Sequence, residues 1–119
     1  MRLVISEKPS VAADLAAVLG GSVTLHPNAP AGARRKEGHF EVGDYIVSYC
    51  YGHLLELTAP DAYGESYAKW RYDDLPIIPQ KWIHTPVKGK AAHLKILTEL
   101  LNRPDLEYVV NACDAGREG

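Results

Sequence analysis

The stretch RLVISEKPS occupies residues 2–10 and determines how we expect the fold to begin. Its apolar run from Leu3 to Ile5 predicts a short buried strand of the kind found in parallel sheets. The acid Glu7 follows the strand, and Pro9 suits the first turn of a helix. We therefore predict a strand, an acidic turn and a helix that stops at Gly20-Gly21. The expected apolar face of this helix consists of Val11, Leu15, Val18 and Leu19.

A second strand is predicted near the other end of the chain. Residues 108–114 are YVVNACD, an apolar run that ends at Asp114 and that we expect to be buried. An amphipathic helix is predicted over residues 88–102, because apolar residues recur at helical spacing and Pro104 follows. Two apolar strands that each end in a carboxylate indicate an open α/β sheet, whose sites lie at the carboxyl ends of its strands.

The segment between these two units predicts a hairpin and an insertion. Residues 38–42 and 45–51 alternate apolar and polar side chains around Gly43-Asp44, which favours a two-residue β-hairpin. Residues 52–86 are rich in Pro, Tyr and Trp, and we interpret them as an ordered insertion with packed aromatic side chains. Short helical pieces are expected near residues 54–57 and 66–70. Residues 22–36 are expected to form an exposed loop.

Composition indicates one soluble globular domain, because the 119 residues are 46% hydrophobic and 24% charged. No stretch resembles a signal peptide or a membrane span. Cys50 and Cys113 lie outside any Cys-x-x-Cys spacing, which favours two buried thiols and a cytoplasmic location. The net charge of −2 does not support a domain that grips nucleic acid by itself. The basic clusters at residues 34–36 and at Lys88/Lys90 are interpreted as solvated faces.

The strand-end acids form a candidate metal site. Mg²⁺ binds one or two carboxylates and leaves its other positions to water and phosphate. Glu7 and Asp114 would meet if their strands were neighbours, and Glu118 would join Asp114 on one side if a helix starts there. Taken singly, each acid is better explained as a helix cap or a solvated side chain.

The sequence also resembles a known family in four segments that occur in the same order. The first ten residues are similar to the start of bacterial topoisomerase III enzymes, where an apolar strand leads into Glu-Lys-Pro-Ser. The other three segments are similar to the family's Gly-His-Leu-Leu-Glu segment, its Leu-Pro-Ile-x-Pro stretch and the acidic Toprim motif, which ends in Arg-Glu-Gly. They lie here at residues 51–56, 70–79 and 111–119.

The resemblance implies a Toprim domain of a type IA DNA topoisomerase, an ATP-independent type I enzyme. It implies an α/β fold with a parallel sheet and flanking helices, here with an inserted β-hairpin and truncated at the acidic motif, so that residues 1–119 would be a partial domain. In such enzymes a tyrosine of another domain attacks single-stranded DNA and forms a 5′-phosphotyrosine. The expected partners are single-stranded DNA and the remaining topoisomerase domains, with no membrane. The fragment alone is expected to be inactive.

Site residues follow from the same resemblance. Glu7 would exchange a proton with the 3′-oxygen and Lys8 would balance phosphate charge. Mg²⁺ would be held by Glu7, Asp114 and Glu118. Arg117 would orient an acid or a phosphate, with a plain surface ion pair as the alternative. Gly116 stands where the family usually has its second Asp, which would leave the metal more hydrated.

Other functions share part of this pattern. A Toprim primase or nuclease would share Glu7, Asp114 and Glu118 but lack the segments at residues 51–56 and 70–79. A noncatalytic signalling module resembling a receiver domain would bind Mg²⁺ and phosphate through its strand-end acids, without a long aromatic insertion. The Gly-x-x-Gly of residues 116–119 matches the clamp of RNA-binding KH domains, but that clamp joins two helices and a strand precedes it here. His53 is expected to fix a local turn.

Overall fold

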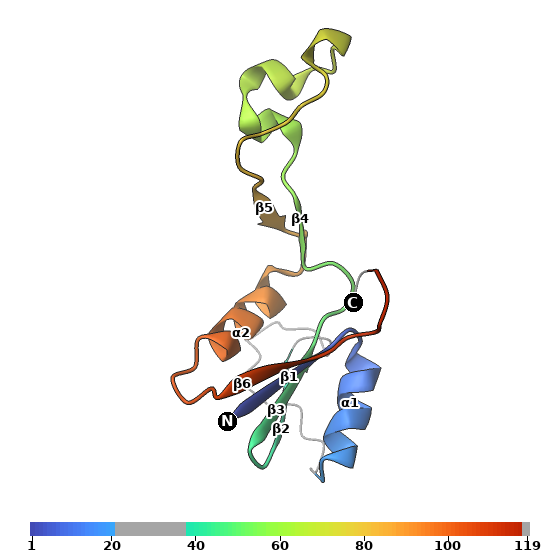
Figure 1. Cartoon of the computed structure of the whole chain (residues 1–119), viewed down its shortest axis with the longest axis vertical. Helices are drawn as coiled ribbons and strands as arrows, with labels where there is room; N and C mark the ends of the chain where they lie inside the picture. Colours follow the sequence, from blue (N-terminus) through green and yellow to red (C-terminus); the bar gives the residue numbers. More distant parts are fainter. Residues whose placement is uncertain (21–37, 118–119) are drawn as a thin grey trace.

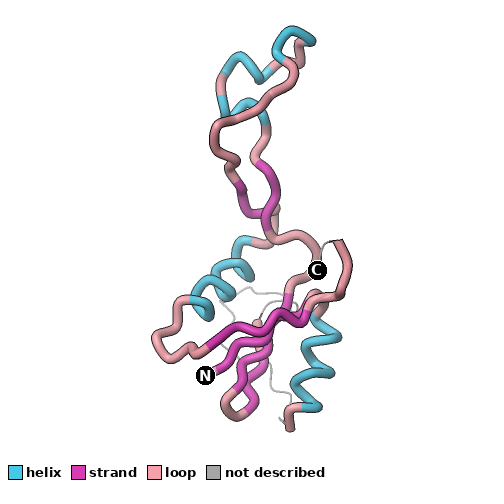
Figure 2. Tube along the Cα trace, in the orientation of Figure 1, coloured by secondary structure: helices cyan, strands magenta, loops and turns pink. Residues whose placement is uncertain are grey.

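A computed structural model describes residues 1–20 and 38–117 of the chain. Two parts are visible in Figure 1: a sheet flanked by helices, and a narrow arm that extends away from one end of the sheet. Figure 2 shows the strands gathered in the first part and short helical turns in the second. The loop expected over residues 22–36, with its basic cluster, lies outside the described residues.

The central sheet has four strands in the order β2-β3-β1-β6. Strand β1 (Arg2–Ser6) lies between β3 (Tyr45–Tyr49) and β6 (Tyr108–Ala112) and pairs in parallel with both. Strand β2 (Phe40–Val42) pairs antiparallel with β3 across the predicted Gly43-Asp44 turn. The hairpin and the adjacency of the two apolar strands are therefore confirmed, and the sheet is mixed but mostly parallel.

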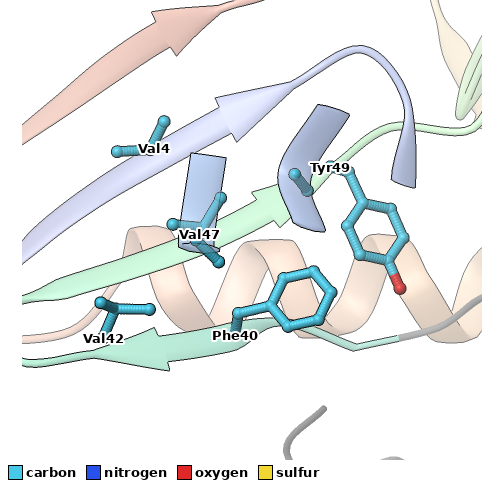
Figure 3. Close-up of a cluster of buried hydrophobic side chains, with 7 residues drawn as sticks. Val4, Phe40, Val42, Val47 and Tyr49 are labelled. Carbon is cyan, nitrogen blue, oxygen red and sulfur yellow. The ribbon is translucent and has the colours of Figure 1, made fainter. Parts of the chain in front are cut away.

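One helix covers each face of this sheet. Helix α1 (Pro9–Val18) packs on the face that carries Val4 and Val47, and Figure 3 shows these side chains beside Phe40, Val42 and Tyr49. Helix α2 (Ala91–Leu101) places Leu100 against Leu3 and Ile46 on the opposite face. Alternate residues of β1 thus point to different helices, as the twofold side-chain period of a strand requires.

Helix α1 buries a different stripe from the one we predicted. Its fully buried residues are Ala12 and Ala16, whereas Val18 is 85% exposed. Small side chains four residues apart let the helix approach the sheet closely, and Val18 in the last turn gains no cover. The apolar pattern correctly indicated a helix, but only part of the predicted face is right: Leu15 is partly buried against the core, whereas Val18 and Leu19 are exposed.

Strand β6 is not buried as we predicted. It is an edge strand of the described sheet, and Val109 and Val110 are 44% and 37% exposed. Its only strand neighbour among the described residues is β1, and α1 and α2 pack mainly over β1 and β3. Apolar side chains therefore reach the surface on both faces of this edge.

The arm begins and ends in a two-stranded ribbon. Strands β4 (Leu55–Leu57) and β5 (His84–Pro86) pair antiparallel, so the helical piece expected over residues 54–57 is wrong. Three 3₁₀ turns follow β4, and the second matches the helical piece expected near residues 66–70; the turns span Pro60–Tyr63, Glu65–Ala68 and Tyr72–Asp74.

The aromatic side chains of the arm are less packed than expected. Trp70 and Tyr72 are 81% and 90% exposed. Tyr63 is held more firmly than these two rings, because its hydroxyl accepts a 2.9 Å hydrogen bond from the Ile83 N–H. A narrow ribbon has no second layer against which further rings could pack, so the expected aromatic packing is wrong for most of them.

The predicted α/β class is confirmed, with a mostly parallel sheet, flanking helices and the hairpin. Within residues 1–20 and 38–117, no helix has the length and apolar character needed to cross a membrane.

Candidate functional site

Glu7 and Asp114 meet at the carboxyl ends of two neighbouring parallel strands. Ser6 of β1 is in register with Ala112 of β6, so the residues that follow both strands leave the sheet at the same edge. The Glu7 carboxylate oxygen Oε2 accepts a 3.1 Å hydrogen bond from the Asp114 N–H. Two acids separated by more than a hundred positions in the sequence are thereby fixed side by side.

Lys8 joins the same cluster. Its ammonium nitrogen Nζ lies 3.3 Å from Oδ2 of Asp114, and both side chains are more than half exposed. An exposed ion pair of this kind contributes little stability because water screens it. Lys8 can therefore exchange Asp114 for another anion at small cost.

The chain turns sharply just after Asp114. The Gly116 N–H donates a 2.8 Å hydrogen bond to the Asp114 carbonyl oxygen, which closes a three-residue turn. Gly116 does not adopt a left-handed backbone conformation, and a Cβ at this position would meet only open space. Arg117 is exposed, and Glu118 lies outside the described residues, so its expected place beside Asp114 stays a prediction.

Lys90 holds the turn that follows β3, a role that no local sequence pattern indicates. Its Nζ donates 2.8 Å hydrogen bonds to the carbonyl oxygens of both Tyr51 and His53. Gly52, between them, has φ +74°, and a Cβ there would lie 3.1 Å from Lys90 Nζ. We predicted Lys90 to be a solvated lysine, which is wrong, because its ammonium group is bound to these two carbonyl oxygens. The two partners lie 39 and 37 positions away in the sequence, so no local pattern reveals them.

His93 fastens α2 beside this turn. It is fully buried, stacks on the Tyr49 ring at 5.0 Å between centroids, and accepts a hydrogen bond from the Gly38 N–H on Nδ1. Its Nε2–H then donates to the Tyr49 carbonyl oxygen, which makes the imidazole the neutral tautomer. His93 is therefore a structural residue that joins α2 to the end of β3.

A cavity of about 260 Å³ opens between the acidic edge and this turn. Glu7 forms part of its wall, and the two cysteines lie on either side. Cys50 follows β3 and Cys113 follows β6, level with Glu7, which follows β1 between them. Both thiols are free and half-buried rather than buried as expected.

Both thiols line the cavity and are uncharged at neutral pH. Burial raises the pKa of Cys50, with smaller contributions from Cys113 and Glu7. Burial also raises the pKa of Cys113, and Glu7 and Asp114 add to this effect. A disulfide does not fit the unmoved backbone, because residues level with each other on strands two apart are separated by about 9–10 Å.

The described residues supply two of the three predicted metal ligands. No group of three His, Cys, Asp or Glu side chains able to hold a metal occurs within residues 1–20 and 38–117. Glu7 and Asp114 offer carboxylate oxygens only, which is the donor chemistry that Mg²⁺ prefers. Each of these carboxylates uses one oxygen in the contact described above and retains a second. The donor set thus fits a hard cation that keeps much of its water.

Comparisons with known proteins agree with the resemblance. The chain is 41% identical over 120 residues to the DNA topoisomerase 3 of Haemophilus influenzae and to that of Pasteurella multocida, and both alignments cover 100% of the chain. It is 38% identical over 117 residues to the DNA topoisomerase 3 of Bacillus subtilis, with 98% of the chain covered. The chain spans only 15–17% of the length of these relatives. No family model matches it.

The two alignments at 41% identity each extend over the whole chain. By sequence, the whole chain is similar to a segment of DNA topoisomerase 3 enzymes that makes up about one sixth of their length.

Proposed function

We propose that this chain is the Toprim part of a type IA DNA topoisomerase and supplies its Mg²⁺-binding and acid/base chemistry. The enzyme would break one DNA strand, pass another through the gap and rejoin the break without ATP, in the cytoplasm. The observation that carries the proposal is the contact between Glu7 and Asp114 at the ends of parallel strands, with Lys8 beside them. The family relationship supplies DNA as the substrate.

Glu7 is the proposed proton carrier. Its carboxyl group, when protonated, could give its proton to the 3′-oxygen as that oxygen leaves the phosphate, and the resulting carboxylate could take the proton back when the strand is resealed. The hydrogen bond from the Asp114 N–H restricts the carboxylate to one orientation, which favours transfer to a defined position. The attacking tyrosine would belong to another domain of the enzyme.

Lys8 and Arg117 are the proposed phosphate contacts. Lys8 lies in an exposed, weak ion pair with Asp114, so a DNA phosphate could recruit its ammonium group. Arg117 is exposed one residue beyond the sharp turn at Gly116, where its guanidinium could pair with a phosphate in two parallel hydrogen bonds.

Mg²⁺ would be held by Glu7, Asp114 and Glu118, and when bound it would offset negative charge on the phosphate. Gly116 adds no ligand of its own. The protein therefore contributes few carboxylates, and water would complete the shell around the cation.

The test uses the enzyme that carries this chain together with its remaining domains. We expect it to relax negatively supercoiled plasmid with Mg²⁺ and no ATP, and to stop when EDTA is added. Denaturant should trap protein on the 5′ end of a cleaved single-stranded oligonucleotide. Hydrolytic cleavage without a covalent adduct would instead indicate a Toprim nuclease, and the proposal would fail.

A further inference from the structure

The cavity beside Glu7 is lined mostly by uncharged side chains, which a phosphate-binding site does not need. Leu54 and Leu94 line it together with the two uncharged thiols. Among the described residues that line it, Glu7 is the only acid and there is no Lys or Arg. Such walls disfavour a phosphate, because an anion would lose its hydration there and meet no Lys or Arg among these lining residues.

The size and position of the cavity narrow the choice of occupant. At about 260 Å³ it is slightly smaller than the sites that enclose drug-sized ligands, and it suits a single planar ring system. Glu7 lines it, and Lys8, which we place on the phosphate, is the next residue of the chain. A group that is covalently attached to the reacting phosphate would therefore reach this cavity when the phosphate reaches Glu7 and Lys8.

We propose that the cavity lined by Leu54, Leu94, Cys50 and Cys113 binds a nucleobase next to the broken phosphodiester. This inference rests on the proposed function, because it takes single-stranded DNA as the substrate. The base would lie between leucine side chains and bury its faces, which is favourable for all four bases. Its role would be to position the phosphate at Glu7 and Lys8.

The architecture gives the cavity a fixed shape. Lys90 clamps the Tyr51–His53 turn on one side, and His93 fastens α2, which carries Leu94, on the other. Gly52 has a left-handed conformation that allows this turn to close on Lys90. A preformed pocket costs little to fill, because few groups must be ordered when the base enters.

The first experiment uses the whole enzyme and a single-stranded oligonucleotide with one mapped cleavage site. One abasic residue is placed at each position around that site in turn, and both the cleavage rate and the dissociation constant are measured. We expect one position near the break at which removal of the base weakens binding about 5- to 150-fold, the effect of losing about 1–3 kcal/mol of base stacking.

Leu94→Trp should fill the cavity and abolish the difference between the intact and the abasic oligonucleotide at that position. Lys95→Trp is the matched control, because Lys95 is the next residue of α2 and its side chain is 77% exposed. The control should keep the wild-type profile. A flat abasic series in an enzyme that cleaves would overturn the inference and leave the proposed function intact. The inference would also be overturned if one abasic position weakens binding and Leu94→Trp leaves that effect unchanged.

Thiol labelling gives a second measurement that needs no variant. Iodoacetamide transfers its carboxamidomethyl group to a cysteine sulfur, forming a C–S bond and releasing iodide and a proton. We expect the intact oligonucleotide to slow labelling of Cys50 and Cys113 and the abasic one to protect them less. Equal protection by both would count against a base, and full protection without DNA would mean that a protein side chain occupies the cavity. If no oligonucleotide is cleaved or bound, the proposed function itself fails.

Discussion

Gly116 offers the sharpest test of where the metal lies, because two explanations for a glycine at this position predict different results. Its backbone is outside the left-handed region, and a Cβ would meet no atom within 4 Å. Gly116→Ala should therefore leave activity nearly unchanged and stabilise the fold by about 0.4–1 kcal/mol through a less flexible unfolded chain. Gly116→Asp should add a carboxylate two residues from Asp114.

The size of the Gly116→Asp effect follows from Coulomb's law. A carboxylate about 6–8 Å from a divalent cation, at an effective dielectric constant near 60, contributes about 1–2 kcal/mol. The Mg²⁺ concentration for half-maximal plasmid relaxation should then fall about 5- to 30-fold. The assay is a Mg²⁺ titration of relaxation by the whole enzyme carrying glycine, alanine or aspartate at this position.

Two outcomes would refute this reasoning. If Gly116→Ala abolishes activity, the glycine is needed for its conformation and the comparison with a metal ligand fails. If alanine is silent and aspartate leaves the titration unmoved, position 116 does not face the metal. Gly52→Ala is the contrasting variant, because Gly52 has φ +74° and only 3.1 Å to Lys90 Nζ, and it should be damaging.

Three further predictions concern the metal, the core and the isolated segment. Asp114→Asn should raise the Mg²⁺ concentration needed for relaxation while leaving the Glu7 contact to the backbone N–H of residue 114 in place; an unchanged titration would remove Asp114 from the metal site. Leu3→Ala, at a position that is 0% exposed, should cost about 2–5 kcal/mol in urea unfolding. Val18→Ala, at 85% exposure, should stay within about 0.5 kcal/mol, and equal costs would contradict the burial of Leu3 and the exposure of Val18. Purified residues 1–119 should not relax supercoiled DNA with Mg²⁺, and should bind single strands weakly and in a salt-sensitive way; relaxation by this segment would place the nucleophile within it.

The elements that could be predicted from sequence are those fixed by local patterns. Apolar runs marked β1 and β6, Pro9 marked the start of α1, and Gly43-Asp44 marked the hairpin between β2 and β3. The meeting of Glu7 and Asp114 was also predictable, because neighbouring parallel strands end at one edge of a sheet. These features need no knowledge of distant contacts.

The remaining features depend on contacts that no local pattern encodes. An apolar run is the same in a central strand and in an edge strand, so the exposure of Val109 and Val110 could not be foreseen. The pairing of β4 with β5 joins residues 55 and 86 across the arm. Lys90 acts through backbone carbonyl oxygens of a distant turn, and any lysine before a helix would look the same in sequence.

The cavity was missed for the same reason. Its wall combines residues from five segments, including the turn after β3, the start of the arm and α2. Cys50 and Cys113 gave no sign of lying level with Glu7 until the register of β1 with both its neighbours was known.

Glu7→Gln in the whole enzyme tests the central claim most directly. Glutamine keeps an oxygen that can accept the hydrogen bond from the Asp114 N–H, but it cannot carry the proton. Glu99→Gln, at an exposed acid of α2, is the control. We predict that Glu7→Gln slows cleavage or resealing of a single-stranded oligonucleotide by roughly 10²–10⁴-fold, with a nearly unchanged dissociation constant. Equal losses of binding and turnover, or full activity in Glu7→Gln, would contradict the account.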